Sequence, residues 1–102
     1  MAIFDVKHGG GPAAGPIPVS ADGTGVVLAA DTYRRYAAIT SDPANTLTVY
    51  LSLDPSAPAV LGGGIPLSPG DRYELTEYNL YQGDIRAIAS AAAQVVAVQS
   101  GK

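Results

Sequence analysis

From Gly25 onward the sequence consists of short runs in which apolar and polar residues alternate, and clusters of turn-forming residues separate one run from the next. Alternation with a period of two is typical of a β-strand with one buried face, because successive side chains point to opposite sides of the strand. The clearest run is Thr46–Leu53, whose alternate residues are apolar: Leu47, Val49, Leu51 and Leu53. Turns spaced about 8–12 residues apart predict an all-β fold, a small antiparallel β-sandwich or barrel of jelly-roll-like form.

Six segments carry the strand pattern: Val26–Ala30, Arg34–Ser41, Thr46–Leu53, Arg72–Glu77, Ile85–Ala89 and Gln94–Gln99. Asp42–Asn45 favours a turn, because Asp and Asn bond to nearby backbone and Pro fixes its own φ. We therefore expect the second and third segments to form a hairpin, and the last two to form another. Ser68–Asp71 has proline and then glycine where a type II turn requires them. For Ile85–Val96 a short helix is the alternative, since alanine favours helix whereas β-branched residues favour strands.

Residues 1–24 differ in composition from the rest, with five of the twelve glycines and three of the eight prolines. Such a segment is excluded from helices and central strands, because glycine leaves the backbone too free and proline lacks an amide hydrogen. Ordering it costs roughly 1–2 kcal/mol per residue in backbone entropy. We therefore expect residues 1–24 to form an extended N-terminal arm outside a β-sandwich domain that spans residues 25–102.

Composition narrows the class of protein. The chain has no cysteine, which excludes disulfides and thiolate sites. A net charge of −3 and a pI near 4.7 disfavour binding to nucleic acid through counterion release. No apolar run approaches the roughly 20 residues of a membrane span, and the sequence after Met1 lacks the pattern of a signal peptide. We expect a soluble protein made in a cytoplasm, with neither nucleic acid nor a membrane as partner.

No set of residues favours catalysis, a metal or a cofactor. His8, the single histidine, stands beside the glycine run Gly9–Gly11, whereas a reaction or a metal needs groups held at fixed geometry. Gly62–Gly64 is interpreted as a hinge rather than a phosphate loop, because no Lys-Ser/Thr follows it. No serine lies in a Gly-x-Ser-x-Gly elbow, so we expect that the protein is not an enzyme. Four aspartates beside Pro or Gly are interpreted as turn-capping residues rather than calcium ligands: Asp42, Asp54, Asp71 and Asp84.

Tyrosine and arginine gather in two places, the run Tyr33–Tyr36 and the connection that follows Glu77. These residue types dominate protein–protein hot spots, because both combine a large contact area with a polar tip. The alternative is that they cap and cover a thin core. Aromatic clusters also bind sugars. The candidate interface residues of the domain are Tyr33, Arg34, Arg35, Tyr36, Tyr78 and Tyr81.

Three segments carry a resemblance to a known group of proteins: Tyr33–Thr40, Ala44–Leu51 and Leu67–Leu75. Their order is an Arg-Arg strand, an Asn-Thr-x-x-Val-Tyr-Leu strand, a glycine-rich loop and Leu-x-Pro-Gly-x-x-Tyr-Glu, followed by a terminal segment of small residues. Over about residues 25–100 the chain resembles small β-sandwich virion proteins of tailed bacteriophages, among them capsid decoration or cement proteins. The motifs are signatures of strands and turns, and they imply no catalytic set.

The resemblance implies a mechanical function, in which the protein stabilises a phage head by bridging neighbouring capsid subunits. The implied partners are the major capsid protein and copies of the chain itself, with a trimer favoured, on the capsid surface of a virion assembled in the host cytoplasm. The long arm would then lie across a neighbour, and its candidate anchors are Ile3, Phe4, Val6, Ile17 and Val19. A tail or head–tail component, and a carbohydrate-binding or adhesion module that uses the tyrosines, are the alternatives.

Overall fold

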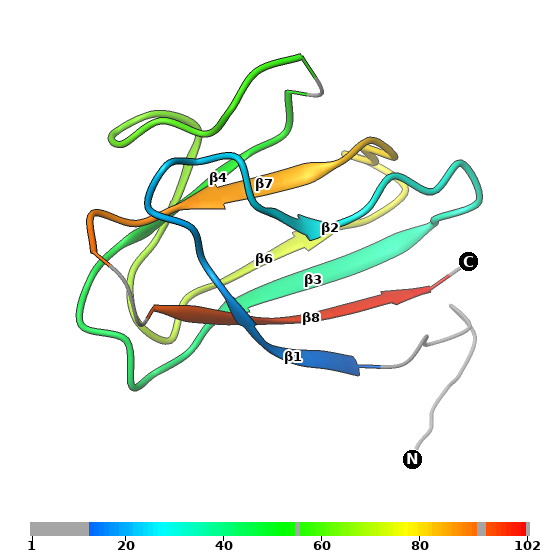
Figure 1. Ribbon diagram of the computed structural model, residues 1–102. Helices are drawn as coiled ribbons and strands as arrows, with labels where there is room; N and C mark the ends of the chain where they lie inside the picture. Colours follow the sequence, from blue (N-terminus) through cyan, green and yellow to red (C-terminus); the bar gives the residue numbers. More distant parts are fainter. Residues whose placement is uncertain (1–12, 55, 92–93, 102) are drawn as a thin grey trace.

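The computed structural model describes residues 13–54, 56–91 and 94–101, which form two packed β-sheets (Figure 1). The eight strands in the described part of the chain are β1 (Ala13–Pro18), β2 (Val26–Leu28), β3 (Tyr36–Ser41), β4 (Val49–Ser52), β5 (Ile65–Leu67), β6 (Arg72–Leu75), β7 (Ile85–Ile88) and β8 (Val95–Gly101). Each of the six predicted segments contains a strand, although most strands are shorter than predicted. Neither β1 nor the short strand β5 was among the six.

The strands pair as one long hairpin that is rolled up on itself. β1 pairs with β8, β2 with β7, β3 with β6 and β4 with β5, and every pair is antiparallel. Two further pairs, β3 with β8 and β4 with β7, join these into sheet A (β1-β8-β3-β6) and sheet B (β2-β7-β4-β5). Eight strands in two sheets with this nested order constitute a jelly roll. The predicted all-β, jelly-roll-like class is therefore confirmed.

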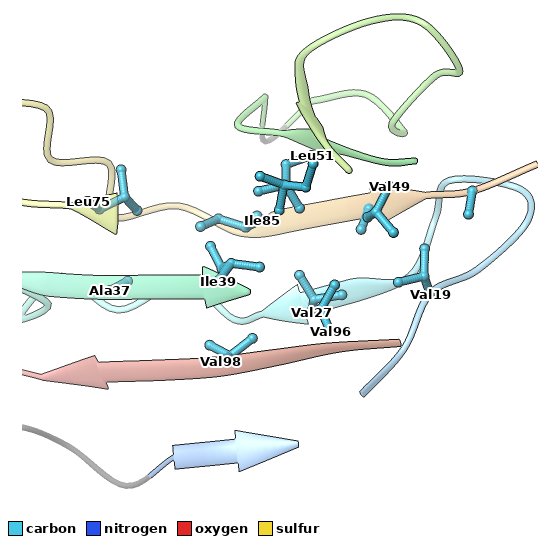
Figure 2. Close-up of a cluster of buried hydrophobic side chains, with 13 residues drawn as sticks. Val19, Val27, Ala37, Ile39, Val49, Leu51, Leu75, Ile85, Val96 and Val98 are labelled. Carbon is cyan, nitrogen blue, oxygen red and sulfur yellow. The ribbon is translucent and has the colours of Figure 1, made fainter. Parts of the chain in front are cut away.

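The core lies between the two sheets and is built from inward-facing aliphatic side chains (Figure 2). Val49 and Leu51 of β4 are fully buried, and Leu53 packs against the same cluster. The alternation predicted for this segment is confirmed. Sheet A contributes its own alternate residues, among them Ile39 and Leu75, which have no exposed surface. Burial of such side chains stabilises the fold by roughly 1.5–3 kcal/mol each.

Both predicted hairpins are wrong. The Asp42–Asn45 turn does form, since the Asn45 amide donates to the Asp42 carbonyl at 2.9 Å. It carries the chain from β3 in sheet A to β4 in sheet B, however, so the two strands do not pair. In the same way β7 and β8 lie in different sheets. Turn chemistry identifies a reversal of the chain. It does not say whether the next strand pairs with the previous one in the same sheet or crosses to the facing sheet.

Two buried amide side chains hold these sheet-to-sheet connections together. Asn45 accepts from the Val95 amide at 2.9 Å, and its Nδ2 donates to the Val95 carbonyl at 2.8 Å. The Oε1 atom of Gln94 accepts from the amides of Thr46 and Leu47 at 2.9 and 3.0 Å. The side chains thus bond to backbone groups of the facing connection, and their own polar atoms are satisfied, as buried polar groups require.

The boundary of the predicted arm also changes. Residues 13–18 are β1, an edge strand of sheet A, in which Ile17 lies opposite Val96 and packs against the core. Val19 is only 5% exposed and belongs to the core. An edge strand tolerates proline because one side of its ladder is unpaired, and the β1–β8 register shifts between Ala14 and Ile17. Ile17 and Val19 are therefore anchors within the chain's own sandwich.

The other predicted arm anchors, Ile3, Phe4 and Val6, lie outside the described residues, as does His8.

The segment Ile85–Val96 contains β7 and the start of β8, so the strand interpretation is confirmed over the alternative helix. In the described part of the chain there is no helix that is both long and apolar enough to cross a membrane.

We predict that two truncations will separate β1 from the residues before it. Deleting residues 1–10 leaves every described strand intact, so the melting temperature should stay within about 2 °C of the full chain. Deleting residues 1–20 removes β1 and the buried side chain of Val19. At about 4–8 °C per kcal/mol for a domain of this size, it should lower the melting temperature by more than about 10 °C. Circular dichroism melting of both variants checks this, and equal stability would contradict the position of β1.

Candidate functional site

Two loops lie together at one end of the sandwich: residues 29–35, between β2 and β3, and residues 76–84, between β6 and β7 (Figure 1). The Asp31 amide donates to the Gln82 carbonyl at 2.9 Å. The Gln82 Nε2 atom donates to the carbonyls of Thr32 and Arg34 at 2.8 and 3.0 Å. The Ala30 amide donates to the Asp84 carboxylate at 2.7 Å. These paired loops contain five of the six residues predicted as the interface of the domain, and Tyr36 follows them at the start of β3.

Arg34 is buried between the paired loops, with 1% of its surface exposed. Its Nη1 atom donates to the Tyr81 carbonyl at 2.7 Å and to the Gly83 carbonyl at 3.3 Å, and its Nη2 atom donates to the Ala29 carbonyl at 2.6 Å. Burial lowers the pKa of the guanidinium, while the nearby carboxylates of Asp31 and Asp84 act in the opposite direction. The interpretation of Arg34 as an interface residue is therefore wrong, because its donors bind the chain's own backbone.

Tyr81 is also turned inward. Its hydroxyl donates to the Asp84 carbonyl at 2.9 Å, and its ring packs against the core. Burial raises the pKa of Tyr81, as do the negative charges of Asp84 and Asp54. A side chain at Gly83 would collide with the Tyr81 ring. Tyr81 thus supports the 76–84 loop from inside, and its ring is half-buried rather than displayed for a partner.

Three of the four remaining predicted residues meet at the surface. Arg35, Tyr36 and Tyr78, together with Thr76 and Glu77, line a shallow depression of about 240 Å³, which we call the Tyr78 depression. Tyr78 is 100% exposed and Tyr33, which does not line the depression, is 73% exposed. Folding has buried Arg34 and turned Tyr81 inward, and it has gathered Arg35, Tyr36 and Tyr78 around one hollow.

Charged side chains stand in and beside this depression. Arg35 bonds to Glu77 at 3.1 Å, and both side chains are more than half exposed. Arg72 contacts Glu74 at 2.8 Å, and the Tyr36 hydroxyl bridges the pair by accepting from Arg72 at 2.9 Å and donating to Glu74 at 3.2 Å. The hydrogen bond to Tyr36 is the main cause of the raised pKa of Arg72. Exposed ion pairs of this kind add only about 0–1 kcal/mol to stability. A ligand can therefore replace such a contact with its own hydrogen bonds at a small loss of free energy.

Three of the four aspartates cap backbone turns, as predicted: Asp42 accepts from the Ala44 amide, Asp54 from Ser56 and Asp71 from Ser68. Asp84 instead accepts from the Ala30 amide and so joins the two paired loops. The bonds from Ser56 lower the pKa of the Asp54 carboxyl. Among the described residues no three His, Asp or Glu side chains gather where they could hold a metal ion.

Gly64 has a role that the sequence did not reveal. Its φ is +70°, and a side chain at this position would collide with the Leu51 carbonyl. Gly64 is therefore required for the close approach of the chain to β4 just before β5, rather than for a hinge. Gly70 has a φ of +88°, and the Asp71 amide donates to the Ser68 carbonyl at 2.8 Å, which confirms the predicted turn there.

Comparison of the chain with protein-family models, with curated proteins and with solved structures gives no match.

We predict that Arg34 and Arg35, although adjacent, differ sharply in their contribution to stability. Arg34→Ala leaves three partly buried carbonyls without this donor and empties the site of a buried side chain, so the free energy of unfolding should fall by about 2–4 kcal/mol. Arg34→Lys should recover only part of this, because an ammonium group cannot reproduce the planar fork. Arg35→Ala is the matched control and should change stability by less than about 1 kcal/mol. Urea unfolding of the three variants checks this, and similar losses for Arg34→Ala and Arg35→Ala would contradict it.

Proposed function

We propose that the protein is a structural component of a virion, a decoration or cement protein that binds the major capsid protein on the surface of a phage head. The observation that carries the proposal is the nested eight-strand jelly roll, since double-sheet jelly rolls are common in viral capsid domains and in lectins. This step is an analogy of fold, which by itself does not fix function. The resemblance of three sequence segments to small virion proteins of tailed phages supports the same proposal independently.

In the proposed mechanism the jelly roll is a rigid body and the segment before β1 ties it to a neighbour. β1 begins at Ala13, opposite Gln99 near the end of β8. The twelve residues that precede Ala13 in the sequence would span roughly 40 Å if extended, at about 3.3 Å per residue. This reach equals the longest dimension of the described protein, 37 Å. Counted from Ala13, extended backbone would carry Val6 roughly 23 Å and Ile3 roughly 33 Å away, with Phe4 between them, which is far enough to reach a neighbouring subunit and anchor there.

Repetition then multiplies the individual contacts. Extended backbone can add as a strand to a partner sheet, with its apolar side chains in pockets of the partner. Many copies on one shell, or a trimer of the chain, would gain avidity from contacts that are weak one by one. A capsid bound in this way would have to break all of these contacts before its shell could open.

The proposal predicts that purified virions contain the protein in many copies, because each repeat of the capsid lattice offers one site. Quantitative mass spectrometry of particles should give tens to hundreds of copies per virion, and immunogold electron microscopy should place them on the head. Labelling of the tail would support the alternative of a tail or head–tail component. Particles without the protein, or a gene far from any capsid or portal gene, would contradict a virion function.

A truncation that tests the anchoring step must end before β1, because removing β1 would also destabilise the fold. The variant without residues 1–10 should fold but show at least tenfold weaker retention on particles stripped of the native protein. The triple substitution of Ile3, Phe4 and Val6 by serine should do the same, whereas Ala2→Ser, which keeps all three anchors, serves as the matched control. Equal retention of all variants would show that the jelly roll binds without the arm.

Carbohydrate binding is a second candidate function, and one observation favours it. Tyr78 is fully exposed at the edge of a depression that also contains charged hydrogen-bonding groups.

A further inference from the structure

The Tyr78 depression differs from the other exposed apolar positions of the described chain, because there an aromatic ring stands beside planar charged groups. The exposed aliphatic residues Val60 and Leu61 belong to the connection between β4 and β5 and do not line the depression. We propose that the Tyr78 depression is a binding site for a saccharide. This proposal extends the second candidate function and does not depend on the virion proposal.

The ring of Tyr78 is presented by a closely bonded turn. The Tyr78 amide donates to the Thr76 hydroxyl at 3.2 Å, and the Thr76 amide donates to the Asn79 side-chain oxygen at 2.8 Å. The Nδ2 atom of Asn79 donates in turn to the Glu74 carbonyl of β6 at 3.1 Å. The backbone on both sides of Tyr78 is therefore tied to sheet A. A ligand that stacks on the Tyr78 ring therefore has less backbone conformational entropy to overcome.

The groups around the ring match the two kinds of surface on a sugar. One face of a pyranose carries C–H groups, which can lie against the flat face of an aromatic side chain, and its edges carry hydroxyls. Arg35 offers donors in a planar fork, and Glu77 offers acceptors. The contact between them joins one guanidinium nitrogen to one carboxylate oxygen, which leaves further donor and acceptor positions for hydroxyls. Thr76 and the ring of Tyr36 complete the wall.

The size of the depression favours a sugar over a protein. Its volume of about 240 Å³ lies just below the range of roughly 300–1,000 Å³ typical of sites for drug-sized ligands, so one or two sugar units fit it. A stable protein interface covers about 800 Å² on each partner and has an apolar centre. The five lining residues include two ionised side chains and no aliphatic one. The exposed lining of the hollow is nevertheless mostly apolar, with the charged groups of Arg35 and Glu77 beside it, and this combination suits the C–H face and the hydroxyls of a sugar.

A glycan array probed with the full chain, followed by calorimetric titration with the strongest bound oligosaccharide, tests the proposal. We expect Tyr78→Ala to weaken binding at least tenfold, or about 1.4 kcal/mol, and Glu77→Gln to weaken it about threefold or more. Tyr78→Trp should retain binding because it keeps an aromatic face. The matched control is Tyr33→Ala, which removes an exposed tyrosine outside the depression and should leave affinity unchanged. Melting temperatures of all variants verify that they are folded.

Two results would overturn the proposal. One is the absence of binding to any saccharide on the array and in millimolar titrations with neutral and acidic monosaccharides. The other is binding that survives Tyr78→Ala, which would place the sugar elsewhere. Neither result bears on whether the protein occurs in virions, because particle composition is measured separately. Conversely, a chain absent from virions could still bind sugar at Tyr78.

Discussion

The antiparallel pairing of β1 with β8 brings the two ends of the described chain together, and every other pair of the long hairpin lies inside it. Only β4 and β5 are paired neighbours in the sequence. Most strand pairs therefore join segments that are far apart in the sequence, and each of them closes a long loop of chain. The conformational entropy lost on closing these loops opposes folding before the pairs form. The aliphatic cluster between the sheets compensates for that penalty, and because both sheets contribute to it, neither sheet has a core without the other.

The ends of the sandwich are closed by polar side chains rather than by apolar packing. Beyond the end of β3, Asn45 and Gln94 bind backbone groups of the facing connection. Before the start of β3, Arg34 does the same for the paired loops. In each case a buried side chain supplies the hydrogen bonds that strand pairing would supply elsewhere. Because Arg34 fixes the paired loops from inside, the exposed rings of Tyr33 and Tyr78 stand on a supported backbone.

Features that depend on neighbours in the sequence could be predicted, and those that depend on distant partners could not. The alternation around Val49 and the turn at Gly70 follow from local chemistry, and both were predicted. The hairpins were wrong because a turn does not specify the sheet of the next strand. Nothing in the sequence predicted that Arg34 rather than Arg35 is buried, because two of the three carbonyls that bind Arg34, those of Tyr81 and Gly83, are distant in the sequence. For the candidate site, sequence supplied Arg35, Tyr36 and Tyr78, but their meeting with Thr76 and Glu77 required the β3–β6 pairing.

The edges of both sheets are poorly suited to direct pairing with another copy. Pro16 and Pro18 remove two donors from β1, and Pro66 removes one from β5. β2 has three residues and an irregular register. On β6, the Glu74 carbonyl already accepts from Asn79. Proline, short strands and irregular pairing are common protections against edge-to-edge association. If the protein assembles as we propose, its contacts with other subunits must therefore come from the segment before β1 or from side chains on its surface, and not from extension of its own sheets.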